Sequence, residues 1–454
     1  MKSPIPDYLK LVLEQVAPLE GGKAAQDIEA LARVDTSKMA VAIATVDGTV
    51  YSAGDDVLEF SIQSISKAFV YALAISDVGI SGVLEKIGVE PSGDPFNELS
   101  LERGPRNRPM NPMINAGAIT AHSLVAGSTP EERVGRILDI LSRLAGRQLE
   151  VDEEVYEAEL NHAYRNMGLA YMLKAAGILE CSPADAVRGY VRQCAINVHV
   201  RDLAMISATL CNGGVQPNSG ETIISQDSVR QVLSVMTTCG MYDASGDWVS
   251  KVGIPAKSGI GGGIIGALPG QLGLAVFSPR IDDRGNSVRG VAMCEALSRD
   301  LGLHMMDMRQ VSHSTMRQSV TTIDCGSKGR AEVPIFEMRG AVRFGGAELL
   351  TRTVARQLNK PVDGDEGSGL RVECPAVIFS FRATVSLSFV AQRILREDIS
   401  RLKADGKDVV VVDPSHVLDM SKFEEGDRPE VYGDMDEALN HVGGVGYKVV
   451  SDHE

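Results

Sequence analysis

Two β-hairpin patterns that lie far apart in this chain of 454 residues constrain its fold more than any other feature. The first joins AVAIATV to TVYSA through Asp47-Gly48, and the second joins GGIIGAL to QLGLAVFSP through Pro269-Gly270. Asp-Gly supplies the positive φ angles that a tight hairpin turn requires. Between the hairpins, the stretch from Ala116 to Val252 is mostly helical in pattern. Strands at both ends of a unit with helices between them predict an α+β fold with an antiparallel sheet flanked by helices.

The length of the chain predicts more than one folded unit, because a domain has about 150 residues. Apolar residues at helical spacing predict a first helix from Asp7 to Pro18 and a closing helix over 288–308. The segment from His313 to Arg330 is polar, contains glycine and has no period, as expected of a linker. We therefore predict a first domain over residues 1–310 and a linker over 311–330.

Beyond the linker, residues 331–454 alternate between strand and helix patterns. Strand patterns lie at 333–338, 376–381 and 409–413, and helix patterns at 345–358, 387–403 and 434–441. This alternation predicts a small, mostly parallel α/β sheet with crossover helices. The acidic segment 361–373 is predicted to be a loop.

The net charge of -15 argues against binding to nucleic acid or anionic lipid, because such partners require clustered positive charge. The N-terminal segment MKSPIPDYLKLVLEQ lacks the apolar core of a secretion signal, and no uninterrupted apolar run approaches membrane-spanning length. The 7 cysteines form no Cys-x-x-Cys pair. We therefore expect a cytoplasmic protein with reduced thiols that acts on a small molecule, with no nucleic-acid or membrane partner.

The sharpest local motif is FSIQSISKAFVYALA, in which Ser64 and Lys67 are separated by one helical turn. A serine hydroxyl is a weak nucleophile and needs a base. Lysine can supply that base if partial burial lowers its pKa enough to leave the amine neutral. The helix N-terminus would also offer N–H groups to an oxyanion. The alternative interpretation is that Ser64 caps the helix and Lys67 is solvated.

A second motif, Lys257-Ser258-Gly259, precedes the second hairpin. Penicillin-recognising enzymes pair Ser-x-x-Lys with a later Lys-Thr/Ser-Gly, in the same order as here. The glycine run 259–263 does not fit a dinucleotide loop, because the strand, helix and distal acid of that fold are missing around it. We interpret these glycines either as a close approach of the backbone to a ligand or as a tight turn.

The sequence predicts no metal and no cofactor. The histidines show no His-x-x-x-His or mixed Cys/His spacing of the kind that binds zinc. Asp363 and Asp365 begin a pattern similar to a calcium loop, but its twelfth position is Cys374, where a bidentate glutamate is needed.

Over about residues 5–308 the chain resembles the serine-dependent glutaminase family, through the motifs QSISK, EPSGDPFN, NPMINAGAI, NGG, CGMYDASG and PAKSGIGGG. The fold of that family is similar to that of β-lactamases and penicillin-binding proteins, in agreement with the antiparallel α+β prediction. The resemblance implies hydrolysis of L-glutamine by water to L-glutamate and ammonia. It also implies a homo-oligomer, either a dimer or a tetramer.

For the chemical step, the resemblance implies that Ser64 of QSISK is the nucleophile and Lys67 its base. Tyr242 in CGMYD aligns with a site tyrosine, which is expected to relay a proton beside Ser64. Ile260 aligns with a residue that contributes its backbone N–H, so its side chain is expected to matter little. The N–H groups of Ser64 and Ile260 are expected to hold the oxyanion.

For substrate binding, the resemblance implies four further residues: Asn115, Glu159, Asn166 and Tyr190. Glu159 falls on the acidic position that grips the α-ammonium group of glutamine, and the others supply polar contacts. Taken singly, the asparagines could cap turns, the glutamate could be a surface acid and the tyrosine could pack in the interior.

One position departs from the family pattern Gly-Lys-x-Ala-x-Tyr-Ile-Pro, because Asp27 stands where tyrosine is expected and Glu29 where proline is expected. An acid at position 27 could repel the substrate carboxylate and weaken affinity, or another tyrosine could take the place of the missing one. Two other functions stay open at the level of the sequence, the first because of the shared Ser-x-x-Lys and Lys-Ser-Gly motifs and the second because of Asp27. One is a β-lactamase-like or penicillin-binding serine hydrolase, and the other is a catalytically weak regulatory protein that acts through its last domain.

The last domain, residues 331–454, resembles a STAS domain, the sulfate-transporter and anti-sigma-antagonist module. Some members of that family carry a phosphorylatable serine after a strand. The comparable stretch here, IFSFRATVSLS, has no Asp-x-Ser. We therefore expect a role in regulation or oligomerisation instead of a phosphoswitch.

Overall fold

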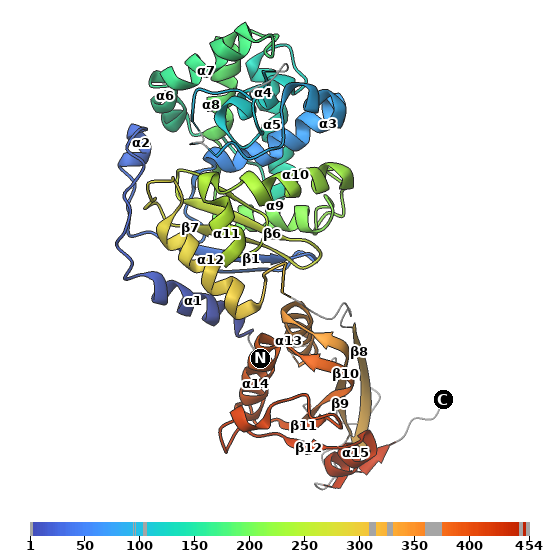
Figure 1. Ribbon diagram of the computed structural model, residues 1–454. Helices are drawn as coiled ribbons and strands as arrows, with labels where there is room; N and C mark the ends of the chain where they lie inside the picture. The colour runs from blue at the N-terminus through green and yellow to red at the C-terminus, as the bar shows by residue number, and fades with distance from the viewer. Residues whose placement is uncertain are drawn as a thin grey trace. The chain divides into compact units, whose positions relative to one another are not determined.

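The computed structural model in Figure 1 divides the chain into two compact units, each with its own sheet and core. The N-terminal unit comprises Pro6–Arg299 and Leu303–Met306. The C-terminal unit comprises residues 3–5, Asp300–Gly302 and the residues from Asp307 onward. The structure describes residues 3–93, 95, 97–102, 107–307, 315–324, 330–358, 375–444 and 448–450.

The N-terminal unit contains a five-stranded sheet in the order β2-β1-β7-β6-β5. The strands are β1 (Ala40–Thr45), β2 (Val50–Gly54), β5 (Ala256–Ser258), β6 (Gly263–Leu268) and β7 (Leu272–Phe277). All neighbouring strands are antiparallel. Both predicted hairpins are confirmed as β1–β2 and β6–β7, and the pairing of β1 with β7 joins them into one sheet. The α+β prediction for this unit is therefore correct.

Helices cover both faces of this sheet (Figure 1). Neighbouring residues of a strand point to opposite faces, as Ile264 and Ile265 of β6 do. Ile265 belongs to the same buried cluster as apolar residues of α9 (Val200–Cys211). On the other face, a Cβ added to Gly290 of α12 (Val288–Leu301) would lie 3.2 Å from Ile264. The closing helix predicted over 288–308 is present as α12, but it ends earlier, at Leu301.

The other helices of the N-terminal unit lie above the sheet or along its edges in Figure 1. They are α1 (Ile5–Val16), α2 (Glu29–Ala32), α3 (Ser66–Lys86), α4 (Asn115–Leu124), α5 (Pro130–Ala145), α6 (Glu153–Asn161), α7 (Tyr164–Ala175), α8 (Pro183–Cys194), α10 (Gln226–Cys239) and α11 (Ser245–Lys251). Two short 3₁₀ turns, η1 (Gln63–Ile65) and η2 (Tyr242–Ala244), and a small two-stranded sheet, β3 (Phe60–Ser61) with β4 (Asn197–Val198), complete the unit.

One helical segment, Gln63–Lys86, is long and apolar enough to cross a membrane by length and composition. The segment contains the charged residues Lys67 and Asp77, so it is not an uninterrupted apolar run. Half of its most apolar window is buried inside the unit, and Lys67 within it is fully buried. Gly79, with φ 76°, interrupts the helical backbone. These features are typical of a helix in the core of a folded unit and not of a membrane span.

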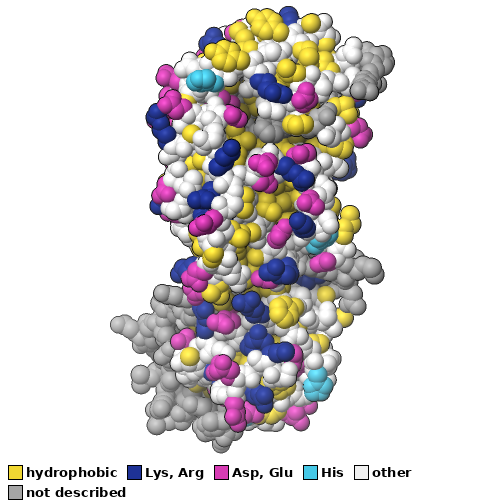
Figure 2. Space-filling view, turned by 60° about the vertical axis from the view of Figure 1, so that its left-hand side comes forward, with side chains coloured by type: hydrophobic (Ala, Val, Ile, Leu, Met, Phe, Trp, Pro, Cys, Tyr) yellow, Lys and Arg dark blue, Asp and Glu magenta, His cyan; other side chains and the backbone are white. Residues whose placement is uncertain are grey.

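The exposed face in Figure 2 mixes Lys and Arg side chains with Asp and Glu side chains over the N-terminal unit. Several charged side chains of the N-terminal unit form ion pairs. Arg147, for example, contacts both Asp202 and Glu59, at 2.7 Å and 2.8 Å. On this face, no single sign of charge dominates a continuous area.

The C-terminal unit contains a six-stranded sheet in the order β12-β11-β10-β9-β8-β13. Its strands are β8 (Thr315–Asp324), β9 (Arg330–Val342), β10 (Ala376–Leu387), β11 (Asp408–Val412), β12 (Glu430–Tyr432) and β13 (Lys448–Val450). The pairs β9–β10, β10–β11 and β11–β12 are parallel, whereas β8 pairs antiparallel with β9 and β13. Helices α13 (Phe344–Leu358), α14 (Phe389–Ala404) and α15 (Met435–Gly444) pack on the sheet, and the short 3₁₀ turn η4 (Met420–Lys422) precedes β12.

One prediction for this region is wrong. The segment predicted as a linker, 311–330, contains β8, which pairs with β9 over its whole length. Most of the described side chains of β8 are exposed, so its sequence is as polar as that of a linker. Its backbone is nevertheless hydrogen-bonded to a neighbouring strand. The helix predicted over 387–403 is confirmed as α14, which begins two residues later at Phe389 because β10 continues to Leu387. The acidic loop predicted over 361–373 lies outside the described residues.

Candidate active site

Ser64 lies in the 3₁₀ turn that leads into α3, at a fixed position against the small sheet. The N–H of Ile62 donates to the carbonyl of Ile196 at 2.8 Å, next to the pairing of β3 with β4. The preceding residue, Gln63, has φ 49°, a left-handed conformation that is unfavourable for a residue with a side chain. Strained residues of this kind cluster at functional sites. Ser64 itself is buried, with 5% of its surface exposed.

Lys67 extends into the interior of the unit from the first turn of α3. Its Nζ donates to Asn115 Oδ1 at 2.7 Å and to the carbonyl of Met113 at 3.2 Å. Burial lowers the pKa of the Lys67 amine to about 8, although Cys194 and Glu159 act in the opposite direction. Roughly a tenth of such an amine is neutral at pH 7. The alternative interpretation of Lys67 as a solvated side chain is therefore wrong.

Asn115 connects the lysine to two other predicted residues. Its Oδ1 also accepts a hydrogen bond from Tyr190 Oη at 3.2 Å, and its Nδ2 donates to Asn166 Oδ1 at 2.9 Å. The four side chains come from α3, α4, α7 and α8, so the packing of these helices brings them together. They form one hydrogen-bonded chain that begins at the amine of Lys67.

Tyr242 approaches Ser64 from η2, with a left-handed φ of 57°. Its Oη donates to the carbonyl of Ser258 at 3.1 Å. Burial raises the pKa of the Tyr242 phenol above its usual range, and a hydrogen bond with Ser64 works against that effect. The hydroxyl therefore stays protonated at neutral pH, within reach of Ser64.

Lys257 adds a second buried amine beside Tyr242. Its Nζ donates to the same carbonyl of Ser258 at 2.6 Å and lies 4.3 Å from the centroid of the Tyr242 ring. Burial lowers the pKa of Lys257 well below its usual range, and the nearby Lys67 adds to the effect. Lys257 belongs to the motif Lys257-Ser258-Gly259, but no sequence pattern places this lysine beside Tyr242.

The glycines that follow Ser258 lie against the turn that carries Ser64. A Cβ added to Gly259 would come within 3.1 Å of the carbonyl of Ile62, and one added to Gly261 would come within 3.2 Å of the carbonyl of Ser61. Side chains at these positions would press on the backbone of that turn. The glycines therefore allow two backbone segments to approach each other closely.

Glu159 reaches the same region from α6. Gln63 Nε2 donates to Glu159 Oε2 at 3.4 Å and to Ser61 Oγ at 3.2 Å. Burial raises the pKa of the Glu159 carboxyl to about 7, against the effects of Gln63 and Lys67. The sequence prediction omitted Gln63. The signal that could have identified it is its position directly before Ser64 in QSISK.

Ile260 is half-buried and packs against a small apolar cluster of Ala25, Ile28 and Leu31. Ala158, the neighbour of Glu159, packs on the same cluster. The segment that carries Asp27 therefore lies beside both Ile260 and the helix of Glu159. The side chain of Asp27 itself is exposed.

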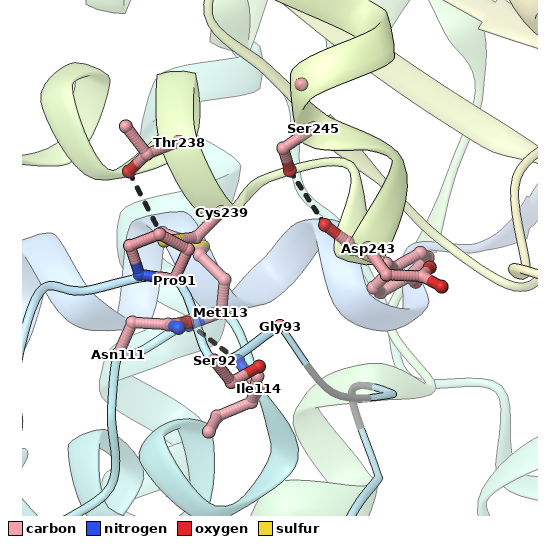
Figure 3. A pocket seen from close by; sticks show the side chains of 12 residues that line it. Pro91, Ser92, Gly93, Asn111, Met113, Ile114, Thr238, Cys239, Asp243 and Ser245 are labelled. Carbon is pink, nitrogen blue, oxygen red and sulfur yellow. Dashed lines mark hydrogen bonds between the residues drawn. The ribbon is translucent and has the colours of Figure 1, made fainter. Parts of the chain in front are cut away.

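A cavity of about 150 Å³ adjoins these residues, and Figure 3 shows its walls. Its lining consists of Pro91, Ser92, Gly93, Asn111, Met113, Ile114, Thr238, Cys239, Tyr242, Asp243, Ser245 and Gly246. Tyr242 belongs to this wall, and so does Met113, whose carbonyl accepts the hydrogen bond from Lys67. The cavity therefore adjoins the site through these two residues, whereas Ser64 and Lys67 are not among the residues that line it.

The predicted residues thus fall into connected groups. Lys67 is hydrogen-bonded to Asn115, which contacts Tyr190 and Asn166, and Tyr242 lies beside Ser64. Glu159 lies next to this network through Gln63, and Ile260 lies close by through the apolar cluster. Within the described residues, no group of three His, Cys, Asp or Glu side chains could hold a metal ion. The arrangement suits attack by a serine hydroxyl with lysine as base.

Comparison with known proteins identifies the family. A profile of the glutaminase family matches residues 22–306. The glutaminase of Corynebacterium glutamicum is 43% identical over 425 residues, which are 93% of this chain and 97% of that protein. The glutaminase of Microcystis aeruginosa is 44% identical over 305 residues, which are 67% of this chain and 90% of that protein.

A solved structure agrees with these matches. The crystal structure of Mglu is 41% identical, has a TM-score of 0.66, and is matched over 92% of this chain and 100% of that chain. The family match covers more than half of the sequence and the similarity to whole glutaminases runs along nearly its full length. This chain is therefore a member of the glutaminase family.

Proposed function

We propose that this protein hydrolyses L-glutamine to L-glutamate and ammonia, with Ser64 as the nucleophile and Lys67 as its base. The observation that carries the proposal is the buried amine of Lys67, one turn beyond a buried serine and hydrogen-bonded to Asn115. The similarity to glutaminases supports the reaction. The lowered pKa of Lys67 supports its role, because a neutral amine can accept a proton.

In the first half of the reaction, Ser64 Oγ attacks the carbon of the side-chain amide and its proton passes to Lys67. The resulting oxyanion is held by the N–H groups of Ser64 and Ile260. The protonated amine of Lys67 then gives its proton to the amide nitrogen, directly or through Tyr242. The C–N bond breaks, ammonia leaves and an ester on Ser64 remains.

In the second half, water attacks the ester carbon and Lys67 accepts a proton from it. The C–O bond to Ser64 breaks as that proton returns to Oγ, and L-glutamate is released. The same base therefore serves both halves, and no other reactant than water is needed.

The two ends of the substrate are bound by different groups. Ionised Glu159 pairs with the α-ammonium group, and Asn166, Tyr190 and Asn115 donate to or accept from the polar atoms of the amino acid. A free amino acid carries both charges, so a site of this kind favours it over an amide without them. This distribution supports free glutamine as the substrate.

A coupled ammonia assay in the presence of hydroxylamine tests the proposal. Hydroxylamine intercepts an acyl-enzyme, so the wild-type protein is expected to form the hydroxamate of glutamate in competition with glutamate. Ser64→Ala is expected to abolish both products. Ser76→Ala, an exposed serine on the same helix α3, is the matched control and is expected to retain full activity.

Two outcomes would contradict the proposal. Ammonia release by Ser64→Ala at a rate close to that of the wild type would exclude Ser64 as the nucleophile. Turnover of a chromogenic β-lactam without turnover of glutamine would instead favour the β-lactamase-like alternative.

We propose further that the protein is a cytoplasmic homo-oligomer, a dimer or a tetramer, and that residues 331–454 form a STAS-like regulatory or oligomerisation domain. The α/β topology of the C-terminal unit supports the last point. The free thiols of five described cysteines suit a reducing compartment. Light scattering of the whole chain and of residues 1–310 would measure the contribution of the last domain to assembly.

A further inference from the structure

Behind Ser64 lies a chain of buried polar groups that the proposed reaction does not use. His122 Nδ1 and Gln193 Oε1 are 2.7 Å apart, and Gln193 Nε2 donates to Ser66 Oγ at 3.3 Å. Ser66 Oγ in turn donates to the carbonyl of Gln63 at 2.8 Å. His122, Gln193 and Ser66 have no exposed surface.

The direction of each hydrogen bond in this chain is fixed. An amide oxygen only accepts, so His122 must donate from Nδ1, and the amide nitrogen of Gln193 must then donate to Ser66. The hydroxyl of Ser66 accepts that bond, and its own proton points to the carbonyl of Gln63. Since the Gln63 carbonyl can only accept, the single proton of Ser66 Oγ is used for that bond, and the hydroxyl is left as the acceptor for Gln193.

His122 is held in one neutral form. Its Nε2 is buried and has no hydrogen-bond partner in the described part of the chain, and a Cβ added to Gly189 would lie 2.0 Å from it. Burial lowers the pKa of His122 to about 4, and the charge of Arg133 adds to the effect. The ring therefore stays neutral, with its one N–H proton on Nδ1 and no proton on Nε2.

This series of hydrogen bonds ends at Gln63, the strained residue that connects Ser64 with Glu159. Gln63 has the left-handed φ of 49°, and its carbonyl is the acceptor for Ser66. Its backbone continues directly into Ser64, and its side chain donates to Glu159. A change in the orientation of Gln63 would therefore move the nucleophile and weaken the hydrogen bond to Glu159 together.

We propose that His122, Gln193 and Ser66 are positioning residues that hold Gln63 in its left-handed conformation, so that its side chain stays on Glu159. The inference rests on the proposed function, in which Glu159 binds the α-ammonium group. It assigns to a buried network the task of keeping this carboxylate ionised and correctly placed for the amino acid.

The test uses Ser66→Ala and Gln193→Met in the full-length protein. Each variant removes one link while the rest of the side-chain volume is kept or nearly kept. We expect KM for glutamine to rise roughly 5- to 50-fold, with a smaller fall in kcat, because misplacement of a substrate-binding group weakens ground-state binding. The double variant is expected to be little worse than either single variant, because both break the same chain.

A pH titration separates positioning from a general loss of stability. L-glutamate is the probe, and its dissociation constant is measured by calorimetry between pH 5.5 and 8.5. The hydrogen bond from Gln63 favours ionised Glu159, so its loss raises the pKa of Glu159. We expect the midpoint below which binding is lost to move to higher pH in both variants.

Ser207→Ala is the matched control. Ser207 is also fully buried and donates to a backbone carbonyl, that of Gly266, at 2.6 Å, but it belongs to α9 away from Gln63. We expect this variant to lower the melting temperature as much as Ser66→Ala does, while KM and the binding midpoint stay at wild-type values.

The outcomes are distinguishable. If Ser66→Ala and Gln193→Met keep the wild-type KM and midpoint, or if Ser207→Ala changes them equally, the positioning role is wrong although the proposed function stands. If the wild-type protein neither hydrolyses glutamine nor binds L-glutamate, the proposed function fails first.

Discussion

The two units each bury an ionisable group, and the same physical effect acts on both. In the N-terminal unit, burial lowers the pKa of Lys67 to about 8. In the C-terminal unit, Asp398 of α14 has 1% of its surface exposed, and burial raises the pKa of its carboxyl to about 7. In both cases the low-dielectric interior disfavours the charged form.

The surroundings of the two groups differ. Asp398 accepts a hydrogen bond from Thr351 of α13, and its other oxygen has no partner among the residues that the structure describes. Lys67 instead donates to Asn115 of α4 and lies near the ring of Tyr190 of α8, one helical turn from a buried serine. A shifted pKa therefore marks a candidate site only where other polar groups converge on it.

The sharpest way to break this comparison is Lys67→Met. Methionine keeps the length of the side chain without a proton acceptor, so we expect ammonia release to fall by roughly 10⁴-fold or more. We expect the melting temperature to be unchanged or higher, because an apolar side chain replaces a buried amine. A variant that keeps more than a tenth of wild-type activity would show that Lys67 is not the base.

The pH dependence of kcat/KM gives the next largest effect. Because Lys67 must be neutral, kcat/KM is expected to rise about tenfold per pH unit below its pKa of about 8 and to level off above it. Protonation of Glu159 below about pH 7 should make the decline steeper. Initial rates at low glutamine concentration between pH 5.5 and 9.5 measure this profile. A flat profile across pH 7 to 8 would contradict it.

Asp398→Asn tests the other side of the comparison. The pKa of this carboxyl is about 7 in the folded protein and near 3.8 when it is unfolded, so the folded state holds the proton more tightly. Its contribution to stability is therefore complete below about pH 4 and is lost as the pH rises through 7. The loss is on the order of 4 kcal/mol, because each pKa unit of the shift corresponds to about 1.4 kcal/mol.

Asparagine cannot titrate, so this variant should lack that part of the pH dependence in urea unfolding of the C-terminal unit. Ammonia release should stay within twofold of the wild type. A tenfold loss of activity would show that Asp398 is coupled to the site after all.

Asp27→Tyr extends the comparison from buried to exposed charge. Asp27 is exposed on the segment that packs beside Ile260, at the position where the family resemblance leads us to expect tyrosine. Removal of the charge and gain of a phenol donor are expected to lower KM for glutamine by about two- to fivefold, as exposed charges act weakly. Asp27→Asn separates the loss of charge from the gain of the ring. An increased KM in Asp27→Tyr would exclude repulsion of the substrate by the acid.

The smallest effect is expected from removal of the C-terminal unit. The family profile matches residues 22–306, and the Microcystis aeruginosa glutaminase aligns with 67% of this chain over 90% of its own length. The chain shortened to residues 1–310 should therefore keep kcat and KM within about twofold, in the same coupled assay. A complete loss of activity in a shortened chain with a cooperative thermal transition would show that the last domain is needed for catalysis.

The sequence predicted those features that depend on neighbouring residues. The turn pair Asp47-Gly48 determined the first hairpin, because tight turns require φ angles that few residues adopt. The spacing of Ser64 and Lys67 placed both on one turn of α3, since helix periodicity is local. Motifs shared with a family supplied the other candidate positions, which no periodicity reveals.

The tertiary structure alone decided which distant residues meet. Gln63 contacts Glu159, and His122 lies behind Ser66 through Gln193, although these partners are separated by long stretches of chain. The strand hidden in the polar segment 315–324 was missed for the same reason, because its partner strand and not its own pattern defines it. Local sequence determines the conformational preference of the backbone. The burial of Lys67 depends instead on which distant residues pack around it, and its pKa depends on that burial.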